Sequence, residues 1–234
     1  MSKIEGMRLK ANWYNYNWLA KRYLVDSLAK TKKFARGKLL DVGCGDKPYE
    51  SFFSGIVTSY IGLDLPRITS PNKLPKRADI YHDLNEDLPF HDCTFDTILC
   101  TEVLEHIPEP NKLIAEMNRV LKKQGYLILS APQAWGLHEE PHDYFRYTKY
   151  GLKYLTEKNG FKIEYIEKRG GVWAMIGQRL ASFIHYSYVD GRNIYAKLFF
   201  KSIYIFITHI CIFLDTLYRH RGDTLGNTIV ARKV

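Results

Sequence analysis

Apolar residues along this chain follow two kinds of pattern. Short continuous apolar runs predict buried strands, and they lie at Lys38 to Val42, Tyr60 to Leu63, Ile80 to His82, Phe95 to Cys100, Tyr126 to Leu129, Phe161 to Ile166 and Gly226 to Ala231. Apolar residues three or four positions apart predict helices at Trp13 to Phe34, Pro110 to Lys123 and Tyr150 to Lys158. Gly125 is the predicted stop of the second helix. Strands that alternate with helices indicate an α/β fold with a seven-stranded, mainly parallel sheet and helices on both faces.

Residues 170–224 do not follow this alternation. They are unusually rich in aromatic and aliphatic side chains, and we interpret them as a hydrophobic helical insertion before the last strand. The sequence therefore predicts four parts: an N-terminal helical cap (1–36), a core (37–169), the insertion (170–224) and the final strand of the core sheet (225–234).

Two glycines, Gly43 and Gly45, stand where the first strand turns toward a helix. Glycine tolerates positive φ and lets a ligand approach the backbone closely. Pro48 occupies the position where a dinucleotide-binding fingerprint has its third glycine, so the cradle for a pyrophosphate is incomplete. A nucleoside ligand without phosphates needs no such cradle. Asp64 ends the second strand about 20 residues beyond the turn, where a carboxylate can accept hydrogen bonds from both ribose hydroxyls.

At these residues the chain resembles class I S-adenosylmethionine-dependent methyltransferases. Leu39 to Gly45 is similar to their first motif, and Asp64 to their ribose-binding acid. The resemblance follows the type 11 branch over roughly residues 36–132, because several weak motifs occur in register. It continues through Phe95 to Ile98, Val103 to Ile107, Arg119 to Lys122 and Gly125 to Leu129.

The resemblance implies a Rossmann-like fold and S-adenosyl-L-methionine as the cofactor. Asp83 matches the acid that meets the adenine amino group, and Cys100 and Thr101 follow the fourth strand near the expected methyl group. The residues implied to bind the cofactor are Asp41, Gly43, Cys44, Gly45, Asp64, Leu65, Asp83, Leu84, Cys100 and Thr101.

Titratable and aromatic side chains are dense from His138 to Thr148, on a segment that reads as a loop. The segment resembles one in bacterial methyltransferases of cell-envelope sugar pathways. We predict His142 as the general base, with Asp143 and His138 as further catalytic residues, since a neutral imidazole accepts a proton near pH 7. Tyr144, Arg146 and Tyr147 are predicted to bind substrate, with Arg146 on a phosphate or carboxylate. The alternative is that Asp143 and Arg146 pair to brace the loop while the tyrosines pack.

No metal is predicted at the site. Glu102, Glu105 and His106 resemble a ligand set found in some magnesium-dependent members, including ubiquinone-pathway O-methyltransferases. The same Leu-Glu-His run is widespread in branches without a metal requirement, and hard cations usually take more oxygen ligands than two carboxylates supply.

The formal net charge of +9 favours an anionic partner, such as a phosphorylated substrate or an anionic membrane surface. Nucleic acid is disfavoured, because the chain lacks the Asn-Pro-Pro-Tyr and Pro-Cys motifs of families that methylate bases. Four scattered cysteines argue against disulfides and a zinc site, and the first six residues carry no apolar run like a secretory signal. We expect a cytoplasmic protein, peripheral on the inner face of the membrane, with a homodimer as an alternative.

The sequence predicts O-methylation of a small or lipid-linked, anionic, sugar-type acceptor such as a glycolipid. The alternatives are a quinone, lipid or RNA substrate, or a cofactor-binding protein that assists envelope assembly without catalysis.

Ser202 to Leu214 is apolar on all sides if it is helical, so the segment must be covered by protein or by lipid. About 13 uncharged residues are too few for a spanning helix, and flanking Lys197, Lys201, Arg219 and Arg221 suit docking on anionic lipid. The alternative is packing on the core or on a second subunit.

Overall fold

The structure is a computed structural model that describes residues 15–65, 78–189, 193–218 and 222–234. Trp13, Arg219, Arg221 and the first six residues lie outside them. The chain divides into two compact units. The sheet unit consists of Lys30–Pro132, Leu137–Glu167 and Asn227–Val234. The helical unit consists of the described residues up to Ala29 together with Gln133–Gly136 and Lys168–Gly226.

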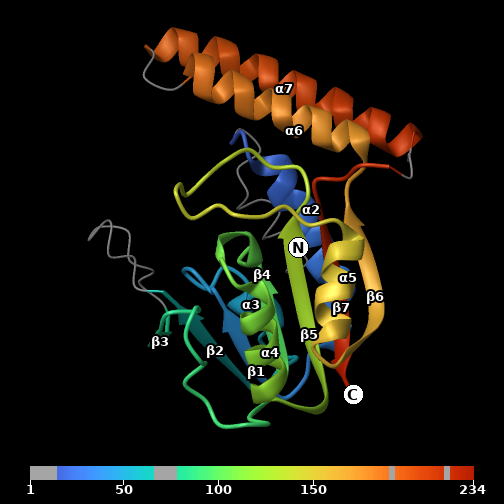
Figure 1. Cartoon of the computed structure of the whole chain (residues 1–234). Coiled ribbons are helices and arrows are strands. Elements are labelled where there is room, and N and C mark those ends of the chain that lie inside the picture. The colour runs from blue at the N-terminus through green and yellow to red at the C-terminus, as the bar shows by residue number, and fades with distance from the viewer. Residues whose placement is uncertain (1–14, 66–77, 190–192, 219–221) are drawn as a thin grey trace. The chain divides into compact units, whose positions relative to one another are not determined.

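All seven predicted strands are present and form one sheet in the order β3-β2-β1-β4-β5-β7-β6 (Figure 1). The strands are β1 (Lys38–Val42), β2 (Ser59–Asp64), β3 (Ile80–Tyr81), β4 (Phe95–Thr101), β5 (Leu121–Pro132), β6 (Phe161–Arg169) and β7 (Gly226–Lys233). β1 pairs in parallel with β2 and β4, β2 with β3, and β4 with β5. The predicted Rossmann-like α/β fold is therefore confirmed.

The last strand runs against the direction of its neighbours. Near the end of β7, Lys233 donates from Nζ to the carbonyl of Leu121, the first residue of β5. The backbone N–H of Val234 donates to the carbonyl of Gly160, just before β6 begins. The end of β7 thus meets the beginnings of both neighbours, so the sheet is mixed at this edge and parallel elsewhere.

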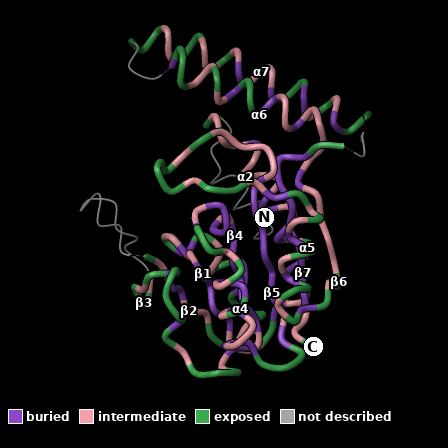
Figure 2. The backbone as a smooth tube through the Cα atoms, viewed as in Figure 1, coloured by how far each residue is buried: buried purple, intermediate pink, exposed green. Residues whose placement is uncertain are grey.

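Short helices alternate with the strands of the sheet unit. α3 (Glu50–Phe53) follows the glycine turn, a 3-10 turn η3 (Leu104–His106) follows β4, and α4 (Pro110–Val120) and α5 (Lys149–Lys158) complete the set. α4 buries Leu113, Ile114, Met117 and Val120, which recur at helical spacing. Figure 2 shows that β1, β4 and β5 are buried along most of their length.

The predicted stop of α4 at Gly125 is wrong. The helix ends at Val120, and Leu121 is already extended as the first residue of β5. β5 bends at Gln124, whose φ is 63°, within the stretch where its register with β4 shifts. Gly125 lies inside the strand, where an added Cβ would come within 2.8 Å of both the Leu121 side chain and the Lys122 carbonyl oxygen. The glycine is needed for this close approach and not for a helix cap.

The helical unit contains α2 (Trp18–Thr31, whose last two residues belong to the sheet unit), α6 (Val172–Ile184), a π-helical turn η4 (His185–Val189) and α7 (Ile194–Leu217). The predicted N-terminal helix is present as α2, followed by a 3-10 turn η1 (Lys32–Phe34). The predicted helical insertion is present as α6 and α7. The expectation that the apolar segment is too short to span a membrane is wrong. α7 has 24 residues, its most apolar window has a mean hydropathy of 1.7, and by length and composition alone it could cross one.

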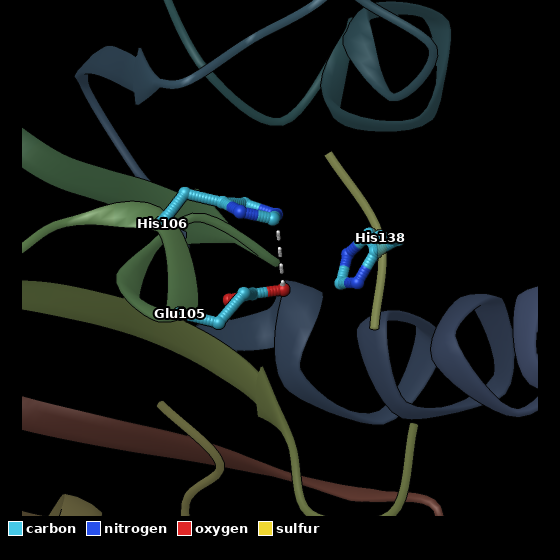
Figure 3. Close-up of side chains that lie close together, drawn as sticks. All are labelled: Glu105, His106 and His138. Carbon is cyan, nitrogen blue, oxygen red and sulfur yellow. Dashed lines mark ion pairs between the residues drawn. The ribbon is translucent and has the colours of Figure 1, made fainter. Parts of the chain in front are cut away.

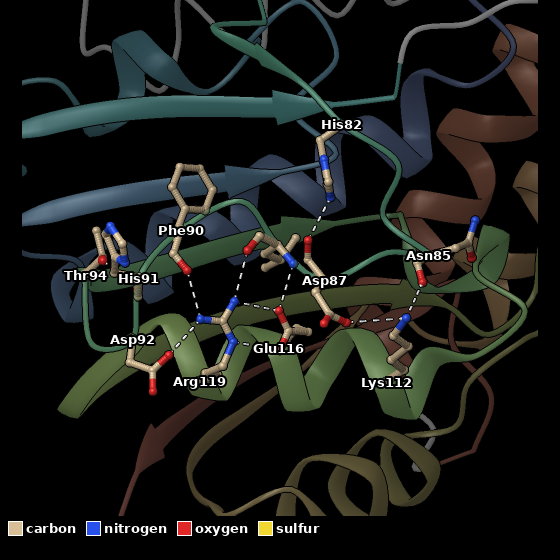
Figure 4. A network of polar contacts seen from close by, with 11 residues as sticks. His82, Asn85, Asp87, Phe90, His91, Asp92, Thr94, Lys112, Glu116 and Arg119 are labelled. Carbon is tan, nitrogen blue, oxygen red and sulfur yellow. Dashed lines mark hydrogen bonds and ion pairs between the residues drawn. The ribbon is translucent and has the colours of Figure 1, made fainter.

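Arg119 on α4 fastens the loop between β3 and β4 (Figure 4). Its guanidinium donates to the carbonyl oxygens of Leu88 and Phe90 at 2.9 and 2.8 Å and forms a fork with Glu116. The Glu116 carboxylate in turn accepts the N–H of Leu88 at 2.7 Å. One side chain thus provides donors for two loop carbonyls, which otherwise have to find other partners.

We predict that Arg119→Met lowers the free energy of unfolding by about 1–3 kcal/mol, because it leaves these carbonyl groups without their donors. Urea unfolding measures the change. Lys112→Met is the matched control: Lys112 lies in the same network and donates to the Asn85 carbonyl, but it is exposed, so we expect about 0.5 kcal/mol or less. Equal losses in the two variants would contradict the assigned role of Arg119.

Candidate functional site

The glycine turn lies at the carboxyl end of β1, in the middle of the parallel strands. The N–H groups of Gly43 and Cys44 both donate to the Leu63 carbonyl oxygen of β2, at 2.8 and 3.1 Å. Gly43 has φ 71°, and an added Cβ would lie 2.2 Å from a methyl carbon of Val103. Gly45 also has positive φ, but an added Cβ there would meet nothing within 4 Å. The turn is tightly packed at Gly43 and open at Gly45, as a backbone that a ligand approaches requires.

Asp64 lies beside this open glycine. It is the last residue of β2, and its Oδ2 accepts the N–H of Gly45 at 2.5 Å. The contact places a carboxylate at the carboxyl end of the strand next to β1, where the sequence predicts the ribose of the cofactor. Leu65 follows and is exposed. Together the open turn and the adjacent acid fit a nucleoside such as that of S-adenosylmethionine.

A buried lysine next to the glycine turn forms an ion pair that the sequence analysis missed. Lys47 is buried and pairs through Nζ with Asp79. The same Asp79 carboxylate accepts the N–H of Gly62 at 2.7 Å. An added Cβ on Gly62 would lie 2.6 Å from the lysine stem and 2.7 Å from the Cys44 sulfur. No local sequence pattern predicts this contact, because Lys47 and Asp79 are far apart in the sequence and only folding brings them together.

Asp41 lies in β1, two residues before Gly43. Its side chain is buried, and its Oδ2 accepts the hydroxyl of Tyr60. Burial raises the pKa of Asp41 to about 7. Burial likewise raises the pKa of Cys44 to about 12, so this thiol is uncharged near neutral pH. Both residues support the turn, and direct cofactor binding by either stays a prediction.

Asp83 and Leu84 follow β3 in a tight local turn. Asp83 accepts the backbone N–H and the side-chain N–H of Asn85 at 2.9 and 2.8 Å. Leu84 is buried in the hydrophobic core of the sheet unit. The structure thus places the acid on the surface of the loop that Arg119 fastens, with the leucine anchoring the loop below it. Their contacts with adenine stay a prediction.

The end of β4 carries Cys100 and Thr101, both buried, followed by Glu102. Burial raises the pKa of the Cys100 thiol well above its usual range. Glu102 has φ 55°, which is uncommon for a residue other than glycine and is often found at functional sites. It is held there by Ser130 of β5, whose carbonyl accepts its N–H at 3.1 Å and whose hydroxyl donates to its Oε1 at 2.8 Å.

A second group of side chains with predicted functions lies on the loop before α5. Asp143 has a buried side chain whose two carboxylate oxygens accept hydrogen bonds from Nη1 and Nη2 of Arg146, each at 2.7 Å. Its Oδ2 also accepts the His138 N–H at 3.0 Å and lies 3.3 Å from His138 Nδ1. Arg146 holds the pKa of Asp143 far below its usual range, so the carboxyl is ionised. The bracing pair weighed as the alternative is thus present, and it also fixes a histidine.

The remaining candidates of this loop have other surroundings. His142 is exposed, and its Nδ1 lies 3.1 Å from the hydroxyl of Tyr144. Tyr147 is buried in the core, where its hydroxyl donates to the Leu104 carbonyl oxygen at 3.2 Å. The geometry gives Tyr147 a packing role, and substrate binding by Tyr144, Arg146 and Tyr147 stays a prediction.

Three side chains converge where η3 meets this loop (Figure 3): Glu105, His106 and His138. Their ligand atoms lie within 4.8 Å of one another, and the two imidazole rings are 4.7 Å apart between centroids. His106 Nδ1 lies 2.6 Å from the His142 carbonyl oxygen, which favours a proton on Nδ1, and its Nε2 lies 3.9 Å from a carboxylate oxygen of Glu105. Glu102, which the sequence grouped with these residues, is bonded to Ser130.

This group offers two imidazoles and a buried carboxylate, which is a donor set for a transition metal and not for magnesium. The same side chains can also bind an acceptor hydroxyl or relay its proton without a metal. His138 was a predicted catalytic residue, but its approach to Glu105 and His106 could not be foreseen, because α4 and β5 separate them in the sequence and His138 lies on a loop without a periodic pattern.

Comparison with known proteins identifies the family. Residues 16–196 match a family model described as a methyltransferase domain, which is more than half of the chain. The chain belongs to this methyltransferase family. The predictions of a class I S-adenosylmethionine-dependent methyltransferase and of its cofactor are confirmed at this level.

Individual relatives agree with this assignment. An uncharacterized methyltransferase of Mycobacterium leprae is 36% identical over 96 residues, which are 39% of this chain and 36% of the relative. A ubiquinone biosynthesis O-methyltransferase of Dechloromonas aromatica is 25% identical over 143 residues, 57% of this chain and 58% of the relative. An S-adenosylmethionine-dependent methyltransferase from Mesorhizobium loti has the same fold, with a TM-score of 0.58 and 15% identity over 92% of this chain and 100% of that one. The chain spans about half the length of the curated relatives.

We predict that Asp64→Ala weakens S-adenosylmethionine binding to this methyltransferase by about 1.5–3 kcal/mol, the scale of hydrogen bonds to a charged group. Gly45→Val should weaken it more, because its side chain would enter the open space above the turn and would strain the positive φ. Isothermal calorimetry measures both. Asp92→Ala, an exposed acid of the sheet unit, is the control, and unchanged affinity in Asp64→Ala would remove this residue from the cofactor site.

The buried Asp41 predicts a specific pH dependence of stability. Because its pKa in the folded protein is raised to about 7, the folded state retains the proton, and the stabilisation is present below about pH 4 and lost as the pH rises through 7. Asp41→Asn removes the charge. We expect its free energy of unfolding, relative to the wild type, to increase by about 2–4 kcal/mol between pH 5 and pH 8.5. Urea unfolding of the cofactor-free proteins at the two pH values tests this, and parallel pH profiles would contradict it.

Proposed function

We propose that this chain transfers the methyl group of S-adenosylmethionine to a hydroxyl of a small or lipid-linked, sugar-type acceptor. The observation that carries the proposal is the His138–Asp143 pair, which lies in the same unit as the cofactor turn. Bound S-adenosylmethionine supplies an electrophilic methyl group. The protein has to hold the acceptor oxygen in line with it and remove the proton of the hydroxyl.

The contacts of His138 favour it over His142 as the group that removes the proton. Asp143 lies 3.3 Å from His138 Nδ1, which favours a proton on that nitrogen and leaves Nε2 to accept the proton of the acceptor. Arg146 fixes the carboxylate from the other side, so the imidazole is oriented before substrate binds. His142 is exposed and has no carboxylate among its contacts in the described part of the chain. The geometry therefore supports His138 as the general base and Asp143 as a positioning residue.

The sugar-type acceptor rests on the resemblance of the His138 to Thr148 segment to envelope-sugar methyltransferases, and its anionic character rests on the net charge of +9. Arg146 is engaged by Asp143 and by the Phe145 carbonyl, so the geometry does not favour it as the anion-binding group. The cytoplasmic location stays a prediction.

A second candidate acceptor is the ring hydroxyl of a quinone precursor, favoured by the Dechloromonas relative named a ubiquinone biosynthesis O-methyltransferase. The two acceptors make different demands on the base. A phenol has a pKa of about 10, whereas an alcohol of a sugar is far less acidic and depends more on proton removal. Release of S-adenosylhomocysteine with a panel of glycolipids, sugars and dihydroxybenzoates distinguishes them, and cofactor binding without turnover on any acceptor would favour the non-catalytic alternative.

We predict that His138→Ala lowers kcat for a sugar acceptor by about 10²–10⁴-fold while leaving the affinity for S-adenosylhomocysteine nearly unchanged. His142→Ala, in the same loop, is the matched control and should retain most of the activity. Asp143→Asn should shift the pH profile of kcat as well as lower kcat, because it changes the orientation and basicity of His138. A folded His138→Ala protein with normal turnover, or a larger loss in His142→Ala, would return the role of base to His142.

A further inference from the structure

α7 buries several polar side chains and exposes large apolar ones, which is the opposite of what a helix in water is expected to do. Its buried residues are Tyr204, Thr208, Cys211 and Asp215, which follow one another at helical spacing along a single face. Phe199, Phe206 and Phe213 recur every seven residues on another face and are 61%, 67% and 61% exposed. Figure 2 shows the resulting alternation of buried and exposed positions along the helix. In a water-soluble helix the phenylalanines would be the buried set.

α6 continues this apolar surface and packs against α7 through small residues. Its buried positions are Ala174, Gly177, Gln178 and Ala181. An added Cβ on Gly177 would lie 2.7 Å from the Cβ of Cys211, so the two backbones approach closely. Leu180 and Phe183 of α6 are exposed. Small residues between helices and large apolar residues outside are the arrangement of helices that face lipid.

The one charged side chain buried beneath this surface, among the described residues of α7, is satisfied from within the unit. The Asp215 carboxylate accepts the hydroxyl of Tyr23 at 3.1 Å and the N–H groups of Gly171 and Ala174 at 2.9 and 3.3 Å. These N–H groups begin α6, so the carboxylate stabilises the start of that helix. The charge lies on the protein side, and the outer face remains apolar.

α2 covers the other side of the pair, which decides how the pair can meet a membrane. Leu19 of α2 packs with Ala174 and Ile212, and Tyr16, just before α2 begins, packs against the cluster that contains Ala181 and Tyr204. These contacts extend along both helices, so lipid can contact only the opposite side of the α6–α7 pair. Although α7 would be about 36 Å long and could span a bilayer by itself, the covered side favours a position in the plane of the interface.

A polar pocket of about 270 Å³ adjoins the same helix pair. Lys21 of α2, His185 of η4 and Lys201 of α7 line it, and its remaining lining residues are Asn15, Tyr16, Asn17 and Tyr204. The His185 ring stacks on Tyr16 at 4.2 Å, and the Gln178 side chain donates to the Tyr16 carbonyl oxygen at 2.8 Å. No carboxylate is among the lining residues that the structure describes. Two ammonium groups, an imidazole and phenols suit a phosphate or another anion.

We propose that the helical unit docks on a membrane in the plane of the interface, with the exposed apolar residues of α6 and α7 in the hydrocarbon and the headgroup of an anionic phospholipid in the pocket of Lys21, His185 and Lys201. The pocket and the apolar surface share α7, so one amphiphilic molecule matches both. Tyr195 in the first turn of α7 and Tyr218 just after its last residue are exposed, as expected for aromatic residues at the level of the headgroups. A second copy of the chain fits less well as occupant, because it carries the same charge of +9.

Sedimentation of the full chain with vesicles tests the proposal, using phosphatidylcholine with and without phosphatidylglycerol. We expect binding to the anionic vesicles that falls as salt is added. Phe206→Ser combined with Phe213→Ser should reduce binding more than tenfold, since two aromatic side chains leave the hydrocarbon. The matched control is Tyr150→Ser with Tyr154→Ser, two exposed aromatics of α5, which should bind like the wild type.

The pocket is tested separately. Lys21→Gln with Lys201→Gln should weaken binding to anionic vesicles by about thirtyfold while changing binding to neutral vesicles little, because each lysine near an anionic surface contributes about 1 kcal/mol. Lys153→Gln with Lys158→Gln on α5 is the charge-matched control. Retained affinity for S-adenosylhomocysteine verifies that every variant is folded.

Three results would overturn the proposal. The first is that the wild-type chain binds neither kind of vesicle. The second is a dimer that the phenylalanine variants dissociate, together with no vesicle binding, which would mean that a second copy covers the apolar surface. The third is tight binding of inorganic phosphate with no added binding from phosphatidylglycerol, which would mean that the pocket holds a free anion. Since no arm measures methyl transfer, failure here is distinct from failure of the proposed catalytic function.

Discussion

The pairing of β1 with β2 and β4 in parallel is the constraint on which the cofactor site depends. Parallel strands end at the same edge, so the glycine turn after β1, Asp64 at the end of β2 and Thr101 at the end of β4 are brought together although they are far apart in sequence. The Leu63 carbonyl fixes the turn by accepting two N–H groups from it. With this register held, the open position at Gly45 and the carboxylate of Asp64 lie side by side. A shift in register would separate them.

Polar groups that would be costly to bury are arranged around this edge in pairs with complementary roles. Asp79 neutralises Lys47 and accepts the N–H of Gly62, so one carboxylate ties the turn to β2. Asp143 in the same way binds Arg146 and orients His138. Pairing offsets the free-energy cost of taking each charge out of water. The remaining hydrogen bonds of each carboxylate then fix the position of the turn or of the histidine. The side chains that we propose to meet ligand are thereby held by residues that need not touch it.

The strands and the turn could be predicted from the sequence because their signals are local. Lys38 to Val42 was predicted with the bounds that the structure has, since a buried parallel strand is a continuous apolar run and a glycine turn follows it. The bend at Gln124 could not be foreseen, because Gly125 is as typical of a helix stop as of a crowded strand. The approach of His138 to Glu105 and the Lys47–Asp79 pair join distant segments, and neither leaves a periodic trace.

The insertion shows how exposure changes the meaning of an apolar sequence. From the sequence, Ser202 to Leu214 could belong equally to a core, an interface between subunits or a membrane surface, because composition does not tell which side faces the protein. The structure supplies that direction. Thr208, Cys211 and Asp215 face inward, where hydrogen bonds within the unit satisfy the carboxylate, and Phe206 and Phe213 face outward. Phenylalanine side chains exposed to water raise the free energy, and an apolar medium or partner that covers them lowers it. The helix that is unfavourable in water is therefore favourable with its outer face in hydrocarbon, which is the position we propose for it.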